Sequence, residues 1–392
     1  MAQASETPVE PSTTSPAAGT GLRPGDRDHW RAIVALVAAG LASFNAMFAT
    51  QALLPTLTED LGVSPASASL TVSALTGMLA LSIIPVSILS ERFGRGRVMI
   101  SSAVIATLLG IALSFSPNIG ILIAGRAIQG VFVAGVPAVA MAWLAEEMHP
   151  DALGSAMGRY VAGTTVGGLL GRLVPAGVLE FASWHVAMLV TSAVAFAFAV
   201  LLALMLPAQR CFVPKRIRLG NELRALAGHW RNPRMASLFA LAFLLMGVFV
   251  SLYNYLGFRL RSEFGFSEAT VGIVFLLYLV GTWTSARAGA FATRLGRAAV
   301  VRIGIILTAV GLALTLTHTL WLVLLGVAVL TGGFFAAHAT ASGWVGALAV
   351  RHRAEASSTY LFCYYLGSSV IGYASGFRLH DGGWPGLVLA LG

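Results

Sequence analysis

The chain has 392 residues, of which 57% are hydrophobic and only 10% are charged, and its formal net charge is +9. A mean hydropathy of +0.81 and repeated uncharged stretches exclude a water-soluble globule. The two cysteines, Cys211 and Cys363, are too few and too far apart for a disulfide framework. The composition therefore predicts an all-α integral membrane protein.

The predicted elements begin with a tail and continue as long apolar helices. Residues 1–28 are rich in Ser, Thr, Pro and Ala and are expected to be disordered. A bilayer core of about 30 Å needs about 20 apolar helical residues, which predicts one helix bundle in 29–207 and a second in 236–392, joined by a cytoplasmic loop at 208–235. Helix 12 would start at Trp384 and be incomplete in this chain, because too few residues follow to cross the bilayer. The expected spans are 32–57, 66–89, 98–116, 119–145, 155–179 and 184–206, then 236–258, 269–290, 299–317, 320–347 and 356–377.

Basic residues are distributed unevenly between alternate connections. Most of the 25 lie in the tail, the stretch 87–98, the central loop and later loops of the same side. Only Arg259, Arg261 and Arg378 are expected on the other side. The positive-inside rule then predicts a multi-pass protein of the bacterial cytoplasmic (inner) membrane with a cytoplasmic N-terminus. The net charge thus reports topology, and nucleic acid is not expected as a partner.

Two sequence motifs occur twice. The stretch SILSERFGRGRV at 87–98 has a second copy, GAFATRLGRAAV, at 289–300. At nearly the same offset, GTTVGG at 163–168 matches GSSVIG at 367–372, and each is followed by an arginine. Each match links a helix to the one six places later, which predicts two six-helix halves in the same orientation. The matched residues are Arg92 with Arg294, Gly94 with Gly296, Arg95 with Arg297, and Arg172 with Arg378.

Parallel six-helix halves are the plan of the major facilitator transporters. The stretch at 87–98 resembles that family's signature Gly-x-x-x-Asp-Arg-x-Gly-Arg-Arg/Lys, with Ser87 for the first glycine, Glu91 for the aspartate and Gly96 at the usual basic position. GRAIQG at 125–130 resembles the family's second signature, Arg-x-x-Gln-Gly. Other motifs, YYLGSSVIG at 364–372 among them, are similar to the YnfM-like branch of drug or arabinose efflux permeases. The resemblance implies a major facilitator fold and secondary active transport by alternating access.

The resemblance also implies a latch in the first of the two repeated loops. In the family, the acidic residue caps the N-terminus of helix 11, where the helix dipole favours an anion. Glu91 would take that place here, and Glu146 and Glu147 would pair with Arg92 or Arg95. The alternative is an ordinary solvated loop on the positive side.

The same loop needs a tight turn, and Gly94 and Gly96 are expected to supply unusual backbone angles. The second copy has Thr293 where the acid would be, so a weaker latch is expected there. The predicted gating residues are Glu91, Arg92, Gly94, Arg95, Arg294, Gly296 and Arg297.

Three arginines fall within predicted spans, where a basic group needs a partner or water, and Arg287 among them is expected to reach the cytoplasmic surface. Arg126 lies beside Gln129 in helix 4 and, by resemblance, lines the central cavity and assists proton movement or anion binding. The alternative is a structural arginine bonded to carbonyl groups. Arg172 is expected near the outer end of helix 5, where its side chain could instead snorkel to the surface.

No carboxylate is expected at the centre of the membrane, because the 16 acidic residues fall in the tail, loops or helix ends. His338 is the embedded group with a reference pKa near neutrality, although a packed histidine is the alternative. Glu59 and Asp60, at the outer mouth of helix 1, are further candidates for accepting protons. Uncharged aromatic and amide groups suit an amphipathic substrate, with interhelical packing as the alternative. The candidates are Asn45, Gln51, Tyr253, Asn254 and Tyr364.

These features favour a transporter over an enzyme. The predicted helices contain no nucleophile and base set, metal cluster or cofactor motif, so neither catalysis nor a cofactor is expected; a channel or receptor stays open in principle. The prediction is proton-coupled efflux, by antiport, of a small organic or drug-like compound, carried out by a monomer in the lipid bilayer. The alternative is uptake of a small organic anion or metabolite through Arg126.

Overall fold

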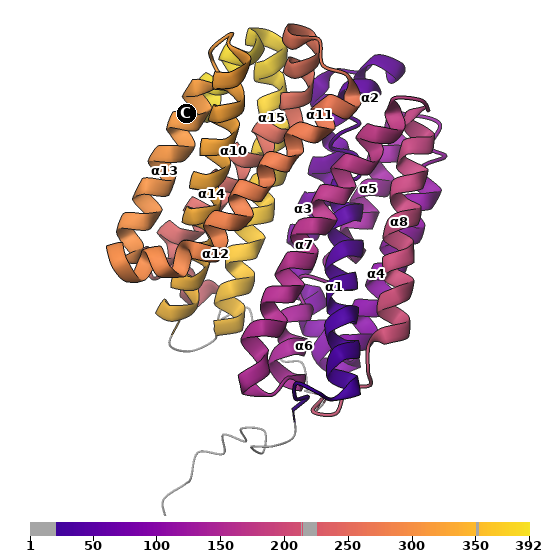
Figure 1. Ribbon diagram of the computed structural model, residues 1–392, viewed down its shortest axis with the longest axis vertical. Helices are drawn as coiled ribbons and strands as arrows, with labels where there is room; N and C mark the ends of the chain where they lie inside the picture. Colours follow the sequence, from indigo (N-terminus) through magenta and orange to yellow (C-terminus); the bar gives the residue numbers. More distant parts are fainter. Residues whose placement is uncertain (1–20, 213, 215–225, 350–352) are drawn as a thin grey trace, which may run out of the picture.

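The computed structural model describes residues 21–212, 214, 226–349 and 353–392 (Figure 1). The described residues form α-helices, one 3-10 turn and an isolated bridge between Leu22 and Met148. The first helices are α1 (Arg27–Phe48), α2 (Leu54–Leu61), α3 (Pro65–Phe93), α4 (Arg95–Leu113), α5 (Ile119–Val133), α6 (Ala140–Glu147), α7 (Pro150–Leu179) and α8 (Trp184–Met205). The later elements are α10 (Pro233–Phe264), α11 (Glu268–Val274), η1 (Phe275–Leu277), α12 (Tyr278–Leu295), α13 (Arg297–Leu314), α14 (Leu320–Leu348) and α15 (Arg353–Leu391).

Several helices start where the sequence supplies a proline or a capping side chain. Proline occupies one of the first two positions of α3, α7 and α10, where its missing N–H costs no hydrogen bond. Within the described residues, nine helices are long and apolar enough to cross a membrane, with α11 to α12 counted as one. The other two predicted spans correspond to α5 followed by α6, and to α15.

Two predicted spans are broken. The span 32–57 ends as a regular helix at Phe48, and turns over residues 49–53 lead into α2. Pro55, near the start of α2, cannot donate a backbone hydrogen bond, which explains why one continuous helix is not formed. The span 119–145 is broken likewise over 134–139, which contain Gly135 and Pro137.

The helices form two sets that lie side by side (Figure 1). Each set has a hydrophobic core of its own, and a further apolar cluster joins Ala52, Leu169 and Ala176 of the first set to the second. The two sets touch chiefly through α3 against α15 and through α7 against α11. We call the end with the α3–α4 and α12–α13 turns the basic face, at the bottom of Figure 1, and the end with α2 and α11 the opposite face.

The repeated glycine motifs are places of close helix packing. A Cβ added at Gly163 would lie 2.7 Å from the carbonyl oxygen of Val37, and one at Gly171 would lie 2.6 Å from that of Asn45. In the second copy, a Cβ at Gly367 would collide with the backbone of Phe243. Small residues let helices approach closely in membranes, so these motifs bring α7 onto α1 and α15 onto α10.

The predicted C-terminal boundary of the disordered tail disagrees with the structure. Residues 1–20 lie outside the described part of the chain. Leu22, however, is buried, its N–H donates to Glu147 O (2.8 Å), and its carbonyl accepts from His149 N (3.1 Å). Because α1 already begins at Arg27, the boundary at residue 28 is wrong. An apolar residue with two backbone partners holds this segment against the start of α7.

Candidate functional site

Arg126, on α5, is fully buried, and its guanidinium has four acceptors. Its Nε donates to Thr71 O (2.9 Å) and its Nη2 to Met47 O (2.7 Å). Its Nη1 donates to Ala46 O (2.8 Å) and to Gln129 Oε1 (2.6 Å). This is the carbonyl-bonded arrangement that the sequence left as the alternative.

The break after α1 explains why these carbonyl groups are available. Gln51 N–H donates to Phe48 O (3.0 Å) instead of continuing the α-helical ladder to Met47 O. Arg126 therefore satisfies a backbone acceptor that the end of α1 leaves without a helical partner. Gln129 is held in turn by donating from Nε2 to Ala106 O (2.7 Å). Arg126 and Gln129 thus tie α5 to α1, α3 and α4.

Arg172, on α7, has a different environment. Its side chain is fully buried, so it does not snorkel to the surface, whereas its sequence match Arg378 is exposed. Its Nε donates to Gln51 Oε1 (2.6 Å) and its Nη1 to Gly168 O (2.7 Å). Its Nη2 is buried and has no hydrogen-bond partner in the described structure. A basic side chain at the centre of a helix in the membrane costs about 2.5–3.5 kcal/mol in insertion experiments, so its surroundings have to compensate.

Aromatic rings from both sets of helices surround the Arg172 guanidinium. Its Cζ lies 3.9 Å from the ring centroid of Phe48 and 4.8 Å from that of Tyr278. Phe275 and Tyr253 follow at 5.6 and 6.0 Å. Rings at these distances attract a cation through their negative faces. We call this group the arginine cage: Arg172, Phe48, Tyr253, Phe275 and Tyr278.

A polar chain extends from the cage to α10. Gln51 accepts from Arg172 and donates from Nε2 to Asn254 Oδ1 (2.6 Å), so it bridges α7 and α10. Asn254 Nδ2 is buried and without a partner in the described residues, as is Arg172 Nη2. The structure therefore brings together three of the predicted residues: Arg172, Gln51 and Asn254.

Ion pairs join the two sets at the opposite face. Arg261, near the end of α10, lies 2.9 Å from Glu59 Oε2 of α2 and 2.9 Å from Glu268 Oε1 of α11. Glu268 also accepts from Thr56 Oγ1 of α2 (2.8 Å). These side chains link the first set to the second at this face.

Glu180, just after α7, adds another link at the opposite face. One of its carboxylate oxygens accepts from Ala269 N–H (2.6 Å) in the first turn of α11. This hydrogen bond, with a further one from Ser267, lowers the pKa of Glu180 below its usual value. Nearby, a Cβ added at Gly272 would lie 2.7 Å from that of Ala176. The ends of α7 and α11 are thus in close contact.

The contact of α7 with the run from α11 to α12 is lost toward the basic face. The run from α11 to α12 starts beside α2 and slopes away from α7 (Figure 1). On the side of α7 that carries Arg172, Gly154, Gly158 and Val161 are exposed, and a Cβ on either glycine would meet nothing within 4 Å. The same is true of a Cβ at Gly289 on α12. The two sets are therefore in contact at the opposite face, whereas at the basic face α7 and α12 are apart and α3 still packs against α15.

The first repeated loop is organised around Arg95, which is buried at the start of α4. Its guanidinium lies 2.7 Å from Glu146 Oε1 and 3.4 Å from Glu91 Oε1. Glu147, in contrast, accepts from the backbone N–H groups of Arg210 (2.9 Å) and Cys211 (3.0 Å). Residues 350–352, immediately before α15, lie outside the described residues, so the predicted cap by Glu91 stays a prediction.

The two repeated turns share one backbone geometry. Gly94 has φ +98° and Gly296 has φ +86°, both in a region that disfavours side chains. Gly96 was expected to behave alike but lies within α4 with negative φ, and its N–H donates to Gln209 Oε1 (3.0 Å). The exposed side chain of Arg92 lies over Phe93, with 5.4 Å between Cζ and the ring centroid. Arg294 and Arg297 are exposed, and no ion pair joins them to other described residues.

His338, on α14, is packed and hydrogen-bonded. Its Nδ1 lies 3.0 Å from Tyr360 Oη, and its ring stacks on Phe334 at 5.7 Å between centroids. The Tyr364 ring lies 4.5 Å from it. This matches the packed alternative, and it places His338 and Tyr364 together on one side of the interface between the sets.

Two other cavity candidates are less accessible than predicted. Asn45 is fully buried, and neither atom of its side-chain amide has a partner in the described structure. The Tyr253 hydroxyl lies 2.8 Å from Thr331 Oγ1, so its polar end points into the second set while its ring belongs to the arginine cage.

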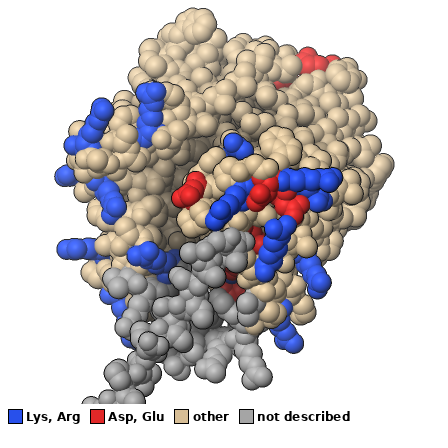
Figure 2. Space-filling model, turned by 60° about the horizontal axis from the view of Figure 1, so that its bottom comes forward, with Lys and Arg blue, Asp and Glu red and all other residues tan. Residues whose placement is uncertain are grey.

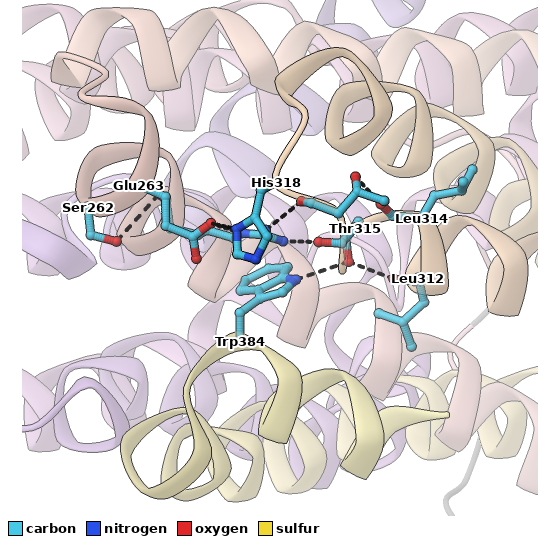
Figure 3. A network of polar contacts seen from close by, with 9 residues as sticks. Ser262, Glu263, Leu312, Leu314, Thr315, His318 and Trp384 are labelled. Carbon is cyan, nitrogen blue, oxygen red and sulfur yellow. Dashed lines mark hydrogen bonds and ion pairs between the residues drawn. The ribbon is translucent and has the colours of Figure 1, made fainter.

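Arg259 is a buried residue that sequence reasoning assigned to a loop. It lies within α10, pairs with Glu263 (3.0 Å), and donates to Thr317 O (2.8 Å) and to Thr315 O. Figure 3 shows the same network, in which His318 approaches Glu263 and the Trp384 indole N–H donates to Thr315 Oγ1 (3.1 Å). The network fixes the ends of three helices around a 630 Å³ cavity at the opposite face.

Comparison with known proteins decides the family. The sequence model of the Major Facilitator Superfamily matches residues 35–282 and 258–392 of this chain. The chain belongs to the Major Facilitator Superfamily. It is 38% identical to the inner membrane transport protein YnfM of Escherichia coli K12 over 93% of this chain and 88% of that protein. It is 36% identical to the uncharacterized transporter YybF of Bacillus subtilis 168, over 94% and 92%.

The fold agrees with that assignment. The nucleoside transporter NupG superposes with a TM-score of 0.75 over 92% of this chain and 96% of that one, at 16% identity. The predicted resemblance and the all-helical major facilitator fold are therefore confirmed. As a member of the superfamily, this chain is a multi-pass membrane protein of a transporter family.

Proposed function

We propose that this superfamily member is a proton-coupled secondary transporter that exports a small organic compound across the bacterial inner membrane by alternating access. The observation that supports it best is the asymmetry of the contacts between the two sets of helices. Arg261, Glu59, Glu268 and Glu180 hold them together at the opposite face. At the basic face, α7 and α12 are apart. Rocking of the two sets about the contact of α3 with α15 would open the opposite face and close the basic face.

The basic face is proposed to lie in the cytoplasm. Figure 2 looks toward this face and shows Lys and Arg side chains gathered around it, with fewer acidic ones. Positively charged connections are retained on the cytoplasmic side of the membrane. With that orientation, the structure is closed to the outside and open toward the cytoplasm, which is the state that receives a compound for export.

The carboxylates of the opposite face are proposed to couple transport to protons. Glu59 and Glu268 share Arg261 across the interface, so protonation of either would weaken an ion pair that keeps this face closed. They are better placed for this role than Arg126, whose four acceptors are all uncharged. His338 is a second candidate, through its contact with Tyr360.

The runner-up is uptake of a small organic anion. Arg172 favours it, because this buried cation forms no ion pair among the described residues. The direction of transport would be set by the coupling to protons and not by the arginine cage. An electroneutral import of an anion with a proton would use the same residues as export.

Cross-linking tests alternating access directly. In a Cys211→Ser, Cys363→Ala background, Ala176→Cys with Gly272→Cys places two thiols across the closed face. Their Cβ positions lie 2.7 Å apart, about 1 Å closer than in a disulfide, so the contact between α7 and α11 has to relax slightly when the bond forms. Gly304→Cys with Ala337→Cys is a matched control with the same Cβ separation inside the second set. The first disulfide should stop transport until it is reduced, whereas the second should leave transport intact.

Everted vesicles provide the readout for direction and coupling. They would be offered ethidium and 1-naphthoate as probes, and export predicts accumulation of at least one that a protonophore abolishes. Accumulation only in right-side-out vesicles would replace export by the uptake alternative. A transport activity that ignores both the cross-link and the protonophore would contradict the proposed mechanism.

A further inference from the structure

Arg172 lies in an unusual position for a buried cation. It is enclosed on all sides, yet none of the ion pairs among the described residues includes it. Among the described residues its Nη2 has no well-formed hydrogen bond, and the polar group close enough to interact with the guanidinium from the second set is the Tyr278 hydroxyl. We propose that Arg172 is the anion-binding residue of this transporter, and that its ligand is an amphipathic organic anion whose carboxylate binds the guanidinium. The inference rests on the alternating access of the proposed function, because it requires the two sets of helices to separate at the opposite face. The ligand then reaches Arg172 from outside, which is the direction of the uptake alternative.

The hydrogen-bond inventory shows what the site lacks. Gln51 Oε1 accepts from Arg172 Nε, and Asn254 Oδ1 accepts from Gln51 Nε2, so both amide oxygens already have donors. Arg172 Nη2 and Asn254 Nδ2 are left as donors without acceptors. A carboxylate contributes only acceptors, and its pairing with a guanidinium is charge-assisted and directional. The missing group is therefore an acceptor. Because the guanidinium also has no opposite charge among the described ion pairs, an anionic acceptor is favoured over a neutral carbonyl.

The composition of the cage explains how a ligand could reach an enclosed guanidinium. Phe48 and Gln51 come from the first set, as does Arg172 itself. Tyr253, Phe275 and Tyr278 come from the second set. Separation of the sets at the opposite face would withdraw these three rings from Arg172 together. A carboxylate can then take over the stabilisation that the ring faces provide in the closed state.

The rest of the ligand is indicated by the same rings. Once parted from Arg172, the faces of Phe275, Tyr278 and Phe48 offer flat apolar area beside the cation. A pocket of this kind binds a compound with an apolar body and a few polar groups. The expected ligand is therefore an aryl or similarly flat carboxylate. Neutral molecules of the same shape would lack the interaction with Arg172.

Ligand-induced thermal stabilisation of the purified full chain tests the inference. The probe is 1-naphthoate, and its neutral isostere 1-naphthamide is the ligand control. Wild-type protein should be stabilised by the carboxylate and not by the amide. In Arg172→Gln the apparent affinity for 1-naphthoate should fall about 10-fold or more, because a charge-assisted bond is lost. Arg172→Lys should retain part of it.

Arg378→Gln is the matched protein control, because Arg378 is the exposed counterpart of Arg172 in the repeat. Its affinity for 1-naphthoate should be unchanged. Phe48→Leu covers the case in which Arg172→Gln does not fold. This change should lower the affinity for 1-naphthoate and leave the protein folded.

Equal stabilisation by acid and amide would overturn the inference, as would binding that survives in Arg172→Gln or Phe48→Leu unchanged. No stabilisation of the wild type by 1-naphthoate would overturn the aryl carboxylate assignment. Either result leaves the cross-linking test of alternating access valid, so failure of the anion site and failure of the proposed function are distinguishable.

Discussion

Arg126 on α5 and Arg172 on α7 are both fully buried, and both contact the region where α1 ends. Arg126 donates to four acceptors, all within the first set of helices. Arg172 donates to two acceptors and is otherwise covered by rings, three of which belong to the other set. The comparison teaches that burial alone does not mark a functional arginine in a membrane protein. What separates the two is whether the partners are complete and whether they move with the residue.

The largest effect on stability is expected from Arg126→Leu. The change leaves the carbonyl group of Met47 and the Oε1 of Gln129 buried without this donor, and each unsatisfied group costs about 1–3 kcal/mol. We expect a total loss of about 3 kcal/mol or more, seen as a strongly lowered melting temperature of the detergent-solubilised protein. Gln129→Leu, which removes one partner, should have a smaller effect. A melting temperature like that of the wild type would mean that Arg126 is not structural.

Arg95→Gln should have an intermediate effect and extends the comparison to the repeated loops. Arg95 is buried against Glu146, but the two carboxylates that face it are about one-third exposed, so solvent screening reduces the pair. We expect a loss of about 1 kcal/mol in the same measurement. Arg297→Gln, at the matching position of the second turn, should change stability by less than about 0.5 kcal/mol. Equal losses would show that Arg95 has no special role.

Arg172→Leu should change stability by less than about 1 kcal/mol, or raise it. Replacing a buried charge that lacks an opposite charge by an apolar side chain removes a desolvation penalty. The melting temperature without ligand should therefore stay near the wild-type value, in contrast to Arg126→Leu. A large drop would place both arginines in the same structural class and remove the basis of the comparison.

The smallest effect is expected from Glu180, which is exposed at the closed face. The hydrogen bond from Ala269 lowers the pKa of this carboxyl group. Stabilisation by a group with a lowered pKa is present above its unfolded value, near 4.5, and is lost as the pH falls through the lower folded value. The Ala176→Cys, Gly272→Cys cross-link should therefore form more slowly below about pH 4.5. In Glu180→Gln this particular pH dependence should be absent.

The sequence was sufficient for the fold, because about 20-residue apolar runs and the repeated loops leave few arrangements. It also singled out Arg126, Arg172, Gln51 and Asn254. It could not assign them, since the difference between Arg126 and Arg172 depends on which carbonyl groups the break after Phe48 releases. That break follows from Pro55, a local signal that hydropathy overlooks.

Contacts between distant residues were the least predictable part. Arg259 and Arg261 are close in sequence, yet Arg259 is buried against the α13–α14 connection and Arg261 bridges the two sets. Counting basic residues in the connections treats Arg259 and Arg261 alike. The count predicts on which side of the membrane a residue lies, but not which way its side chain points. Glu268 and Ser267 marked a helix start, but their partners lie in α2 and after α7.

The paired turns at Gly94 and Gly296 show how exact the internal repeat is. Their backbone angles agree, with φ and ψ of 98° and 128° in one and 86° and 145° in the other, although Glu91 has no acidic counterpart at Thr293. The charges around the two turns differ, because the turn geometry does not depend on them. The glycine is kept in both, because a side chain at that angle would strain the reversal between two helices. The internal repeat of this chain is therefore more exact in its main-chain conformation than in its side chains.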